Sequence, residues 1–245
     1  MARPPILLVH GAFSHAHHFD GWVVALAGAG FDCHAPSLPG HWPSDASALA
    51  YLTLSDYLAS LHRTAAALSA PPVVIGHSMG GLLAQQLAAT APCTALVLVA
   101  SAPPWVLFPQ LRAMPFLVRQ MPAILAGRPI RPDVGTLRLL ALHDLPEPEQ
   151  YELVPTFGAE SGQALRAMIL GSARISGRQF RGPVLCLSGS EDRVISSRIS
   201  KMIAHYYSAS HETFANRGHW LIASSAQDEV VATIVRWLEK HAINA

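Results

Sequence analysis

Short apolar runs, most of them ending at a glycine, a proline or a polar turn, recur along this chain. They predict six strands, at Pro5–Val9, Phe31–Ala35, Val73–Ile75, Ala95–Ala100, Pro183–Ser188 and His211–Phe214. Strands that are apolar at nearly every position are typical of parallel sheets, which are buried on both faces.

Segments with helical spacing separate these strands. Between Leu54 and Leu68, apolar residues recur every three or four positions, which predicts an amphipathic helix. Gly80–Thr90 is rich in small residues, and Val230–Leu238 has apolar positions at helical spacing. Strands that alternate with helices predict the α/β class: a mostly parallel sheet of about six strands, covered by helices on both faces.

The segment 103–182 departs from this alternation, because it has helical periodicity and no clear strand. Asp133–Leu142 and Ser161–Leu170 are predicted helices, each beginning with a residue type that caps helix N-termini. We therefore expect a core domain of residues 1–102 and 183–245 and a helical cap over the ligand-binding edge of the sheet. The alternative is that the extra helices only thicken the core.

Composition excludes several classes of protein. Hydrophobic residues make up 51% of the 245 residues, charged residues 13%, and the net charge is +1, which argues against disorder and against a nucleic-acid or anionic-membrane partner. The apolar run near the N-terminus is too short to span a membrane, and we expect the prolines at 109, 115 and 122 to break the apolar segment 105–126 into short pieces. Three dispersed cysteines, Cys33, Cys93 and Cys186, suggest neither disulfides nor zinc, so we expect a cytoplasmic protein.

The sequence Gly76-His77-Ser78-Met79-Gly80-Gly81 carries the strongest chemical signal. It directly follows a predicted strand and opens a predicted helix. Glycines two positions before and two after the serine permit a sharp strand-to-helix turn that exposes the Ser78 hydroxyl above the sheet edge. The spacing therefore predicts a nucleophilic serine rather than an ordinary glycine-rich turn.

A serine nucleophile needs a base, and the base needs an acid that orients it. Asp192 lies in the turn after the fifth predicted strand, and His219 lies in a glycine-containing turn after the sixth. These turns reach the same sheet edge as Ser78, so we predict Asp192 as the acid and His219 as the base. Glu191 is the rival acid, and Asp192 has the alternative role of a helix cap.

The run Ile6–Gly11, the GHSMGG turn, the SGSEDRV turn and the RGHW turn together resemble the α/β-hydrolase superfamily. The resemblance covers nearly the whole chain. In its layout the chain is similar to compact capped members of the superfamily, such as methyl-salicylate esterases and hydroxynitrile lyases. It implies that the backbone amides of Ala12 and Met79 form the oxyanion hole. It also implies that His10 has a structural role.

The stretch His15–Asp20 contains three histidines, but its spacing departs from the His-x-His-x-Asp-His array of metallo-lactonases. We interpret it as a solvated loop and predict no metal and no cofactor.

Serine at the turn suits acyl transfer, whereas dehalogenases and epoxide hydrolases of this superfamily need a carboxylate there. We therefore predict a serine carboxylic-ester hydrolase for small to medium lipophilic esters, lactones or thioesters, with an acyl-enzyme intermediate. The alternatives are a carbon–carbon bond hydrolase or lyase that uses the same triad, or a ligand-binding receptor with slow hydrolysis. We expect five apolar side chains to line the substrate pocket: Phe13, Trp105, Phe116, Met121 and Trp220.

Overall fold

The computed structural model describes residues 3–42, 44, 46–171, 175, 180–241 and 243. Within these residues, six strands form one sheet in the order β2-β1-β3-β4-β5-β6, and every neighbouring pair is parallel. The strands are β1 (Ile6–Val9), β2 (Cys33–His34), β3 (Val73–His77), β4 (Ala95–Val99), β5 (Val184–Gly189) and β6 (Ser210–Phe214). The predicted α/β class with a parallel sheet is confirmed.

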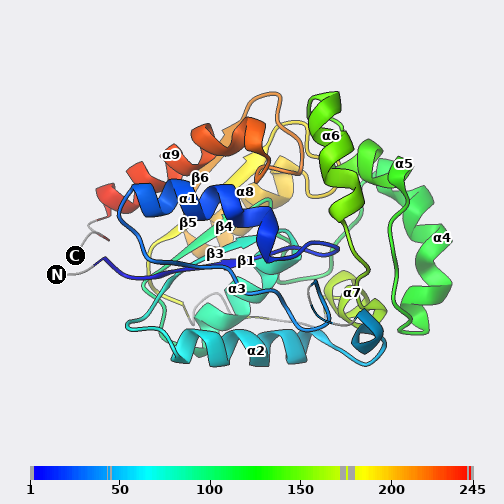
Figure 1. Ribbon diagram of the computed structural model, residues 1–245, viewed down its shortest axis with the longest axis horizontal. Helices are drawn as coiled ribbons and strands as arrows, with labels where there is room; N and C mark the ends of the chain where they lie inside the picture. The colour runs from blue at the N-terminus through cyan, green and yellow to red at the C-terminus, as the bar shows by residue number, and fades with distance from the viewer. Residues whose placement is uncertain are drawn as a thin grey trace.

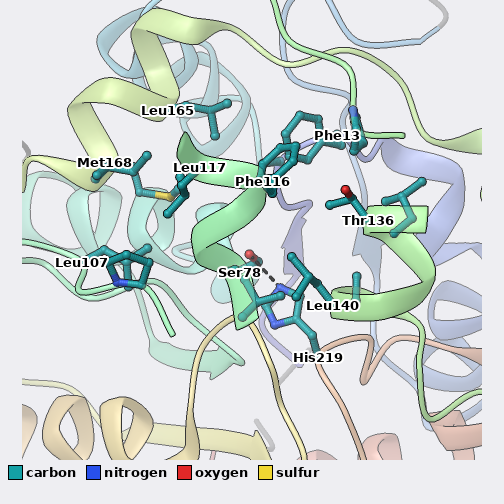
Figure 2. A pocket seen from close by; sticks show the side chains of 18 of the residues that line it. Phe13, Ser78, Leu107, Phe116, Leu117, Thr136, Leu140, Leu165, Met168 and His219 are labelled. Atoms are coloured by element: carbon teal, nitrogen blue, oxygen red, sulfur yellow. Dashed lines mark hydrogen bonds between the residues drawn. The ribbon is translucent and has the colours of Figure 1, made fainter. Parts of the chain in front are cut away.

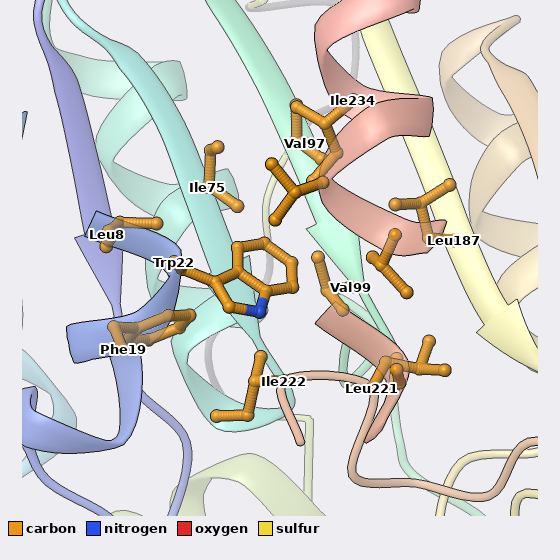
Figure 3. Packing of buried hydrophobic residues seen from close by; sticks show 14 of the residues in the cluster. Leu8, Phe19, Trp22, Ile75, Val97, Val99, Leu187, Leu221, Ile222 and Ile234 are labelled. Atoms are coloured by element: carbon orange, nitrogen blue, oxygen red, sulfur yellow. The ribbon is translucent and has the colours of Figure 1, made fainter. Parts of the chain in front are cut away.

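Alternating side chains of the strands fill two separate apolar cores, because successive residues of a strand point to opposite faces. Ile6 and Leu8 lie in the first core with Trp22, whereas Leu7 and Val9 lie in the second. Figure 3 shows the first core, in which the Trp22 indole packs against apolar side chains from several strands. Burial on both faces explains why the strand sequences are apolar throughout.

Helices cover both faces of the sheet (Figure 1). The first core is covered by α1 (Asp20–Gly28) and α9 (Ser224–Lys240), which contact each other. The second core is covered by α2 (Leu54–Ala66), α3 (Met79–Thr90) and α8 (Ser197–Tyr207).

The chain between β4 and β5 is here called the insertion (residues 103–182). The helices of the insertion lie at one end of the molecule (Figure 1). Its helices are α4 (Met114–Leu125), α5 (Val134–Thr136), α6 (Glu147–Leu153) and α7 (Gly162–Ile169). Short 3-10 or π turns complete the fold, at η1 (Ala16–Phe19), η2 (Ala46–Ala50), η3 (Leu111–Ala113), η4 (Leu137–Ala141) and η5 (Val154–Thr156). No helix in the described ranges is long and apolar enough to cross a membrane.

Two helix starts in the insertion follow the predicted caps. The Asp133 side chain accepts a hydrogen bond from the Thr136 amide at 2.8 Å, and the Ser161 hydroxyl accepts one from the Ala164 amide at 3.2 Å. After Asp133, however, the predicted α-helix lasts a single turn and widens into the π turn η4.

Two local interpretations were wrong. The stretch His15–Asp20 is a partly buried 3-10 turn that leads into α1, not a solvated loop, and Phe19 is buried. The prolines of the insertion also do not break α4 into pieces. Pro115 occupies the first turn, where no intrahelical hydrogen bond is lost, and Pro122 lies within the continuous helix, close to its C-terminal end.

Candidate active site

Ser78 occupies the sharp turn between β3 and α3, with φ 55° and ψ −120°. Its amide donates to the Val99 carbonyl at 3.0 Å, which ties the turn to β4. A side chain at Gly76 would collide with the Gly80 carbonyl, and one at Gly80 would collide with the Val9 carbonyl. Glycine is therefore required on both sides of the serine, where strand and helix cross closely.

Ser78, His219 and Asp192 form one chain of hydrogen bonds. The Ser78 hydroxyl donates to His219 Nε2 at 3.1 Å, drawn as the dashed line in Figure 2. His219 Nδ1 donates to Asp192 Oδ2 at 2.8 Å. The carboxylate and the imidazole are buried, whereas Ser78 is partly exposed. The orientation leaves Nε2 as the acceptor for the serine proton.

The backbone after β5 orients the Asp192 carboxylate. Asp192 Oδ1 accepts hydrogen bonds from the amides of Val194 at 2.7 Å and Ile195 at 2.8 Å, so Oδ2 is left for the histidine. Glu191 is exposed, and its amide donates to the Arg217 carbonyl. The geometry therefore brings Asp192, and not Glu191, to His219.

The two amides expected for an oxyanion hole lie on either side of the serine turn. Met79 is the first residue of α3, where an amide has no intrahelical acceptor. Ala12 follows β1 and lines the same cavity as Ser78. Neither amide has a hydrogen-bond acceptor among the residues that the structure describes. His10 accepts a hydrogen bond from the Leu38 amide at 2.9 Å, which is a structural contact.

A cavity of about 150 Å³ lies over Ser78, between the sheet edge and the insertion. Figure 2 shows the hydroxyl and the imidazole at its base, with apolar side chains around them. None of the residues that line it in the described chain is Asp, Glu, Lys or Arg. The insertion supplies most of the lining, including Leu107, Phe116, Leu117, Leu140, Leu165 and Met168.

Sequence comparison agrees with this architecture. Residues 6–233 match the profile of the Alpha/beta hydrolase family. The chain belongs to that family. Its six-stranded parallel sheet is the fold of an alpha/beta hydrolase enzyme.

Two curated relatives of this alpha/beta hydrolase differ in coverage. A pyrethroid hydrolase of Sphingobium wenxiniae is 32% identical over 81 residues, which are 33% of this chain and 29% of that protein. The magnesium-chelatase 30 kDa subunit of Rhodobacter capsulatus is 27% identical over 96% of this chain and 87% of that protein.

Solved structures share the fold at low sequence identity. A monoacylglycerol lipase of Paleococcus ferrophilus is 21% identical, with a TM-score of 0.75 over 98% of this chain and 96% of that one. A methylesterase from Arabidopsis is 14% identical, with a TM-score of 0.75 over 96% of this chain and 99% of that one.

Of the five side chains expected in the pocket of this alpha/beta hydrolase, Phe13, Phe116 and Trp220 line the cavity, whereas Trp105 and Met121 do not. Met121 is five residues after Phe116 on α4, which places it about 140° around the helix axis from the lining face. Trp105 instead makes an edge contact with Tyr206 of α8, at 5.7 Å between ring centroids, in a separate surface hollow.

Three polar side chains of the insertion that the sequence did not indicate reach the turns of the candidate site. Gln110 donates to the Asp192 carbonyl at 2.8 Å, and Asp144 accepts from the amide of Gly218, next to His219, at 2.7 Å. Glu160 lies 3.4 Å from the amide of Phe13, beside Ala12. These contacts join residues 74 to 147 positions apart, so no local motif indicates them.

His18, in the 3-10 turn η1, is hydrogen-bonded through its whole ring edge. Both ring nitrogens of His18 hydrogen-bond, to Ser14 and Thr156, each at 2.7 Å, so the ring has no free nitrogen for a metal. Burial, with the charges of His15 and His17, lowers the pKa of His18 from 6.5 to about 3. Among the residues that the structure describes, no three His, Cys, Asp or Glu side chains are grouped so that they could hold a metal ion.

His77, directly before Ser78 in the sequence, packs against the His219 imidazole. Its Nε2 donates to the His219 carbonyl at 3.0 Å, and its ring lies against the His219 ring, with 5.0 Å between centroids. Burial, and then the neighbouring His219, lowers the pKa of His77 from 6.5 to about 3. His77 is therefore a neutral support for the His219 turn.

Proposed function

We propose that this enzyme is a serine carboxylic-ester hydrolase for lipophilic esters, lactones or thioesters. The observation that carries the proposal is the hydrogen-bonded chain Ser78–His219–Asp192 at the base of an apolar cavity. This combination provides a nucleophile, a base and an oriented acid where an uncharged acyl group can bind.

In the proposed first step, the Ser78 oxygen attacks the carbonyl carbon of the ester while its proton passes to His219 Nε2. Asp192 stabilises the imidazolium that forms. The carbonyl oxygen becomes an oxyanion, which accepts hydrogen bonds from the amides of Ala12 and Met79. The position of Met79 at the start of α3 adds the positive end of a helix dipole.

Collapse of the tetrahedral intermediate breaks the bond to the alcohol, which leaves with the proton from His219. The acyl group remains on Ser78 as an ester. A water molecule then gives a proton to His219 and attacks the acyl carbon. The bond to the Ser78 oxygen breaks, His219 returns the proton to that oxygen, and the acid is released. No step needs a metal or a cofactor.

We further propose that the insertion acts as a cap that selects the acyl chain. The apolar side chains of α4 and α7 that line the cavity, such as Phe116 and Met168, favour methylene groups over charged groups. The pyrethroid and acylglycerol compounds in the names of the similar proteins are also esters, which supports this class.

A screen of the purified enzyme with p-nitrophenyl esters, lactones and vinylogous diketones tests the proposed function. Turnover of esters or lactones that is abolished by Ser78→Ala is the expected result. Turnover of the diketones alone would indicate carbon–carbon bond hydrolysis by the same triad. Binding without turnover would indicate a receptor, and either outcome contradicts the proposal.

A further inference from the structure

Glu160 is a fully buried carboxylate of the insertion. Its backbone forms an antiparallel bridge with Ile130, with hydrogen bonds in both directions. Its Oε1 accepts hydrogen bonds from the Tyr57 hydroxyl and from the Ser161 amide, both at 2.7 Å. A buried carboxylate with several donors is held in one orientation, because loss of a donor leaves the charge without a partner.

The second oxygen of Glu160 faces His41, in the chain between β2 and α2. His41 Nε2 donates to Glu160 Oε2 at 3.0 Å, and Nδ1 donates to the Pro39 carbonyl at 3.1 Å. A carboxylate and a backbone carbonyl both accept hydrogen bonds, which favours the charged imidazolium with a proton on each ring nitrogen. Burial lowers the pKa of His41, but the hydrogen bond and charge of Glu160, together with the backbone at Pro39 and Leu38, raise it overall. Glu160 and His41 thus form a buried ion pair.

This ion pair adjoins the turn that carries the Ala12 amide. Glu160 Oε2 lies 3.4 Å from the Phe13 amide nitrogen, a long but charge-assisted contact. On the other side, the Gly158 amide donates to the Phe13 carbonyl at 2.8 Å. Two neighbouring residues of the insertion therefore hold both backbone groups of Phe13.

Phe13 needs this support because its φ is 64°. A residue with a side chain is strained in this left-handed region and stays there only where its neighbours hold it. The Phe13 amide lies one peptide unit after the Ala12 amide, so rotation of the backbone at Phe13 would move the turn that carries the Ala12 amide relative to Ser78. The phenyl ring also borders the cavity (Figure 2).

We propose that Glu160 is a positioning residue for the oxyanion hole: its carboxylate, held by His41 and Tyr57, fixes Phe13 and thereby aims the Ala12 amide at the oxyanion. The inference rests on the proposed ester hydrolysis. An amide aimed at the oxyanion acts in the transition state more than in the bound substrate. Loss of the carboxylate therefore lowers kcat and leaves KM nearly unchanged.

Glu160→Gln tests this role, with Gln163→Ala as the matched control. Gln163 also ties the insertion to the rest of the chain, through the Ala50 carbonyl at 3.0 Å, but it does not line the cavity. For Glu160→Gln we expect kcat for a p-nitrophenyl ester to fall about tenfold to a hundredfold, with KM within about twofold. Gln163→Ala should lower Tm and keep both constants.

A second readout isolates the oxyanion hole. A trifluoromethyl ketone adds to Ser78 and forms an oxyanion, whereas the matching methyl ketone binds without one. Glu160→Gln should lower the affinity for the trifluoromethyl ketone by the same factor as it lowers kcat. The affinity for the methyl ketone should not change. A lower Tm with unchanged kcat and unchanged inhibitor affinity would show that Glu160 only holds the insertion, and would overturn the proposal.

Tyr57→Phe is the second variant, because Glu160→Gln removes a buried charge and could prevent folding. It keeps the ring and removes one donor to the carboxylate, so we expect kcat and trifluoromethyl ketone affinity to fall by the same factor, about threefold. Unchanged values would contradict the inference. A wild-type enzyme without ester turnover would overturn the proposed function and this inference together, whereas active wild type with unaffected variants overturns the inference alone.

Discussion

The two walls of the cavity differ in chemistry. The sheet wall presents Ser78, His77 and His219, joined by hydrogen bonds of fixed geometry and held at a turn with positive φ. The insertion wall presents mainly leucine, phenylalanine and methionine side chains. Bond making requires atoms placed to a fraction of an ångström, whereas apolar contact is non-directional. In the proposed function, the sheet edge performs the reaction and the insertion selects the acyl group that enters the cavity.

The insertion has polar side chains where it contacts the turns of the candidate site. Gln110 contacts the turn at Asp192, Asp144 contacts the turn at Gly218 and His219, and Glu160 contacts the turn at Ala12 and Phe13. Its apolar lining and its polar anchors therefore have separate tasks, and variants can distinguish them.

Removing the nucleophile is the largest expected effect on the sheet wall. Ser78→Ala should lower ester turnover by roughly four to six powers of ten while the fold persists, because no other group replaces the hydroxyl. His219→Ala should cost nearly as much, and the double variant little more. Steady-state kinetics with circular dichroism as the folding control measures this. Additive losses would show that the two residues do not act as a unit.

Asp192→Asn should cause the next largest loss of ester turnover. The amide favours the wrong imidazole tautomer, so turnover should fall by about four powers of ten. Glu191→Gln, one residue away and exposed, is the matched control and should change turnover by less than about threefold. Parallel kcat measurements decide between the two carboxylates. The reverse order of effects would make Glu191 the orienting acid.

The insertion wall should determine the dependence on acyl-chain length. If it binds the acyl group, kcat/KM should rise by up to about fourfold for each methylene from acetate to hexanoate, since burial of a methylene is worth about 0.8 kcal/mol. Phe116→Glu should flatten this rise. Val118→Glu, on the same helix but 65% exposed, should keep it. A wild-type preference for acetate or for an anionic acyl group would contradict the lipophilic pocket.

Replacing His77 should have the smallest effect on catalysis at neutral pH and should instead change how stability depends on pH. Its pKa is lowered to about 3 in the folded protein. Between its ordinary value of 6.5 and about 3, the unfolded chain binds a proton that the folded chain excludes. The free energy of unfolding should therefore fall as the pH drops through this range. His77→Gln, which keeps a donor for the His219 carbonyl, should weaken that dependence. Urea unfolding from neutral pH to about 4 measures it, and an unchanged slope would mean that His77 is protonated in the fold.

The sheet and the serine turn could be predicted because local sequence determines them. Apolar runs specify buried parallel strands, and Gly76 and Gly80 are required by the close crossing at Ser78. Asp192 and His219 followed from the order of turns along one sheet edge. Strand β2 was predicted longer than the two residues that pair with β1, because an apolar run does not show where a sheet edge ends.

The insertion was less predictable because its residues act through tertiary contacts. Phe116 and Met121 are equally apolar in sequence, yet only the packing of α4 decides which one faces the cavity. Glu160 is separated from Tyr57 by 103 residues and from His41 by 119. A buried ion pair assembled across such distances leaves no periodic pattern along the chain.

Mass spectrometry tests directly whether Ser78 on the sheet wall forms the acyl-enzyme. Wild-type enzyme is acid-quenched during turnover of a p-nitrophenyl hexanoate, digested and mapped. We expect one hexanoyl group on the peptide that contains Ser78, and no hexanoyl group on the same peptide of Ser78→Ala. Rapid turnover with a hexanoyl group on another residue, or turnover that persists in Ser78→Ala, would contradict it.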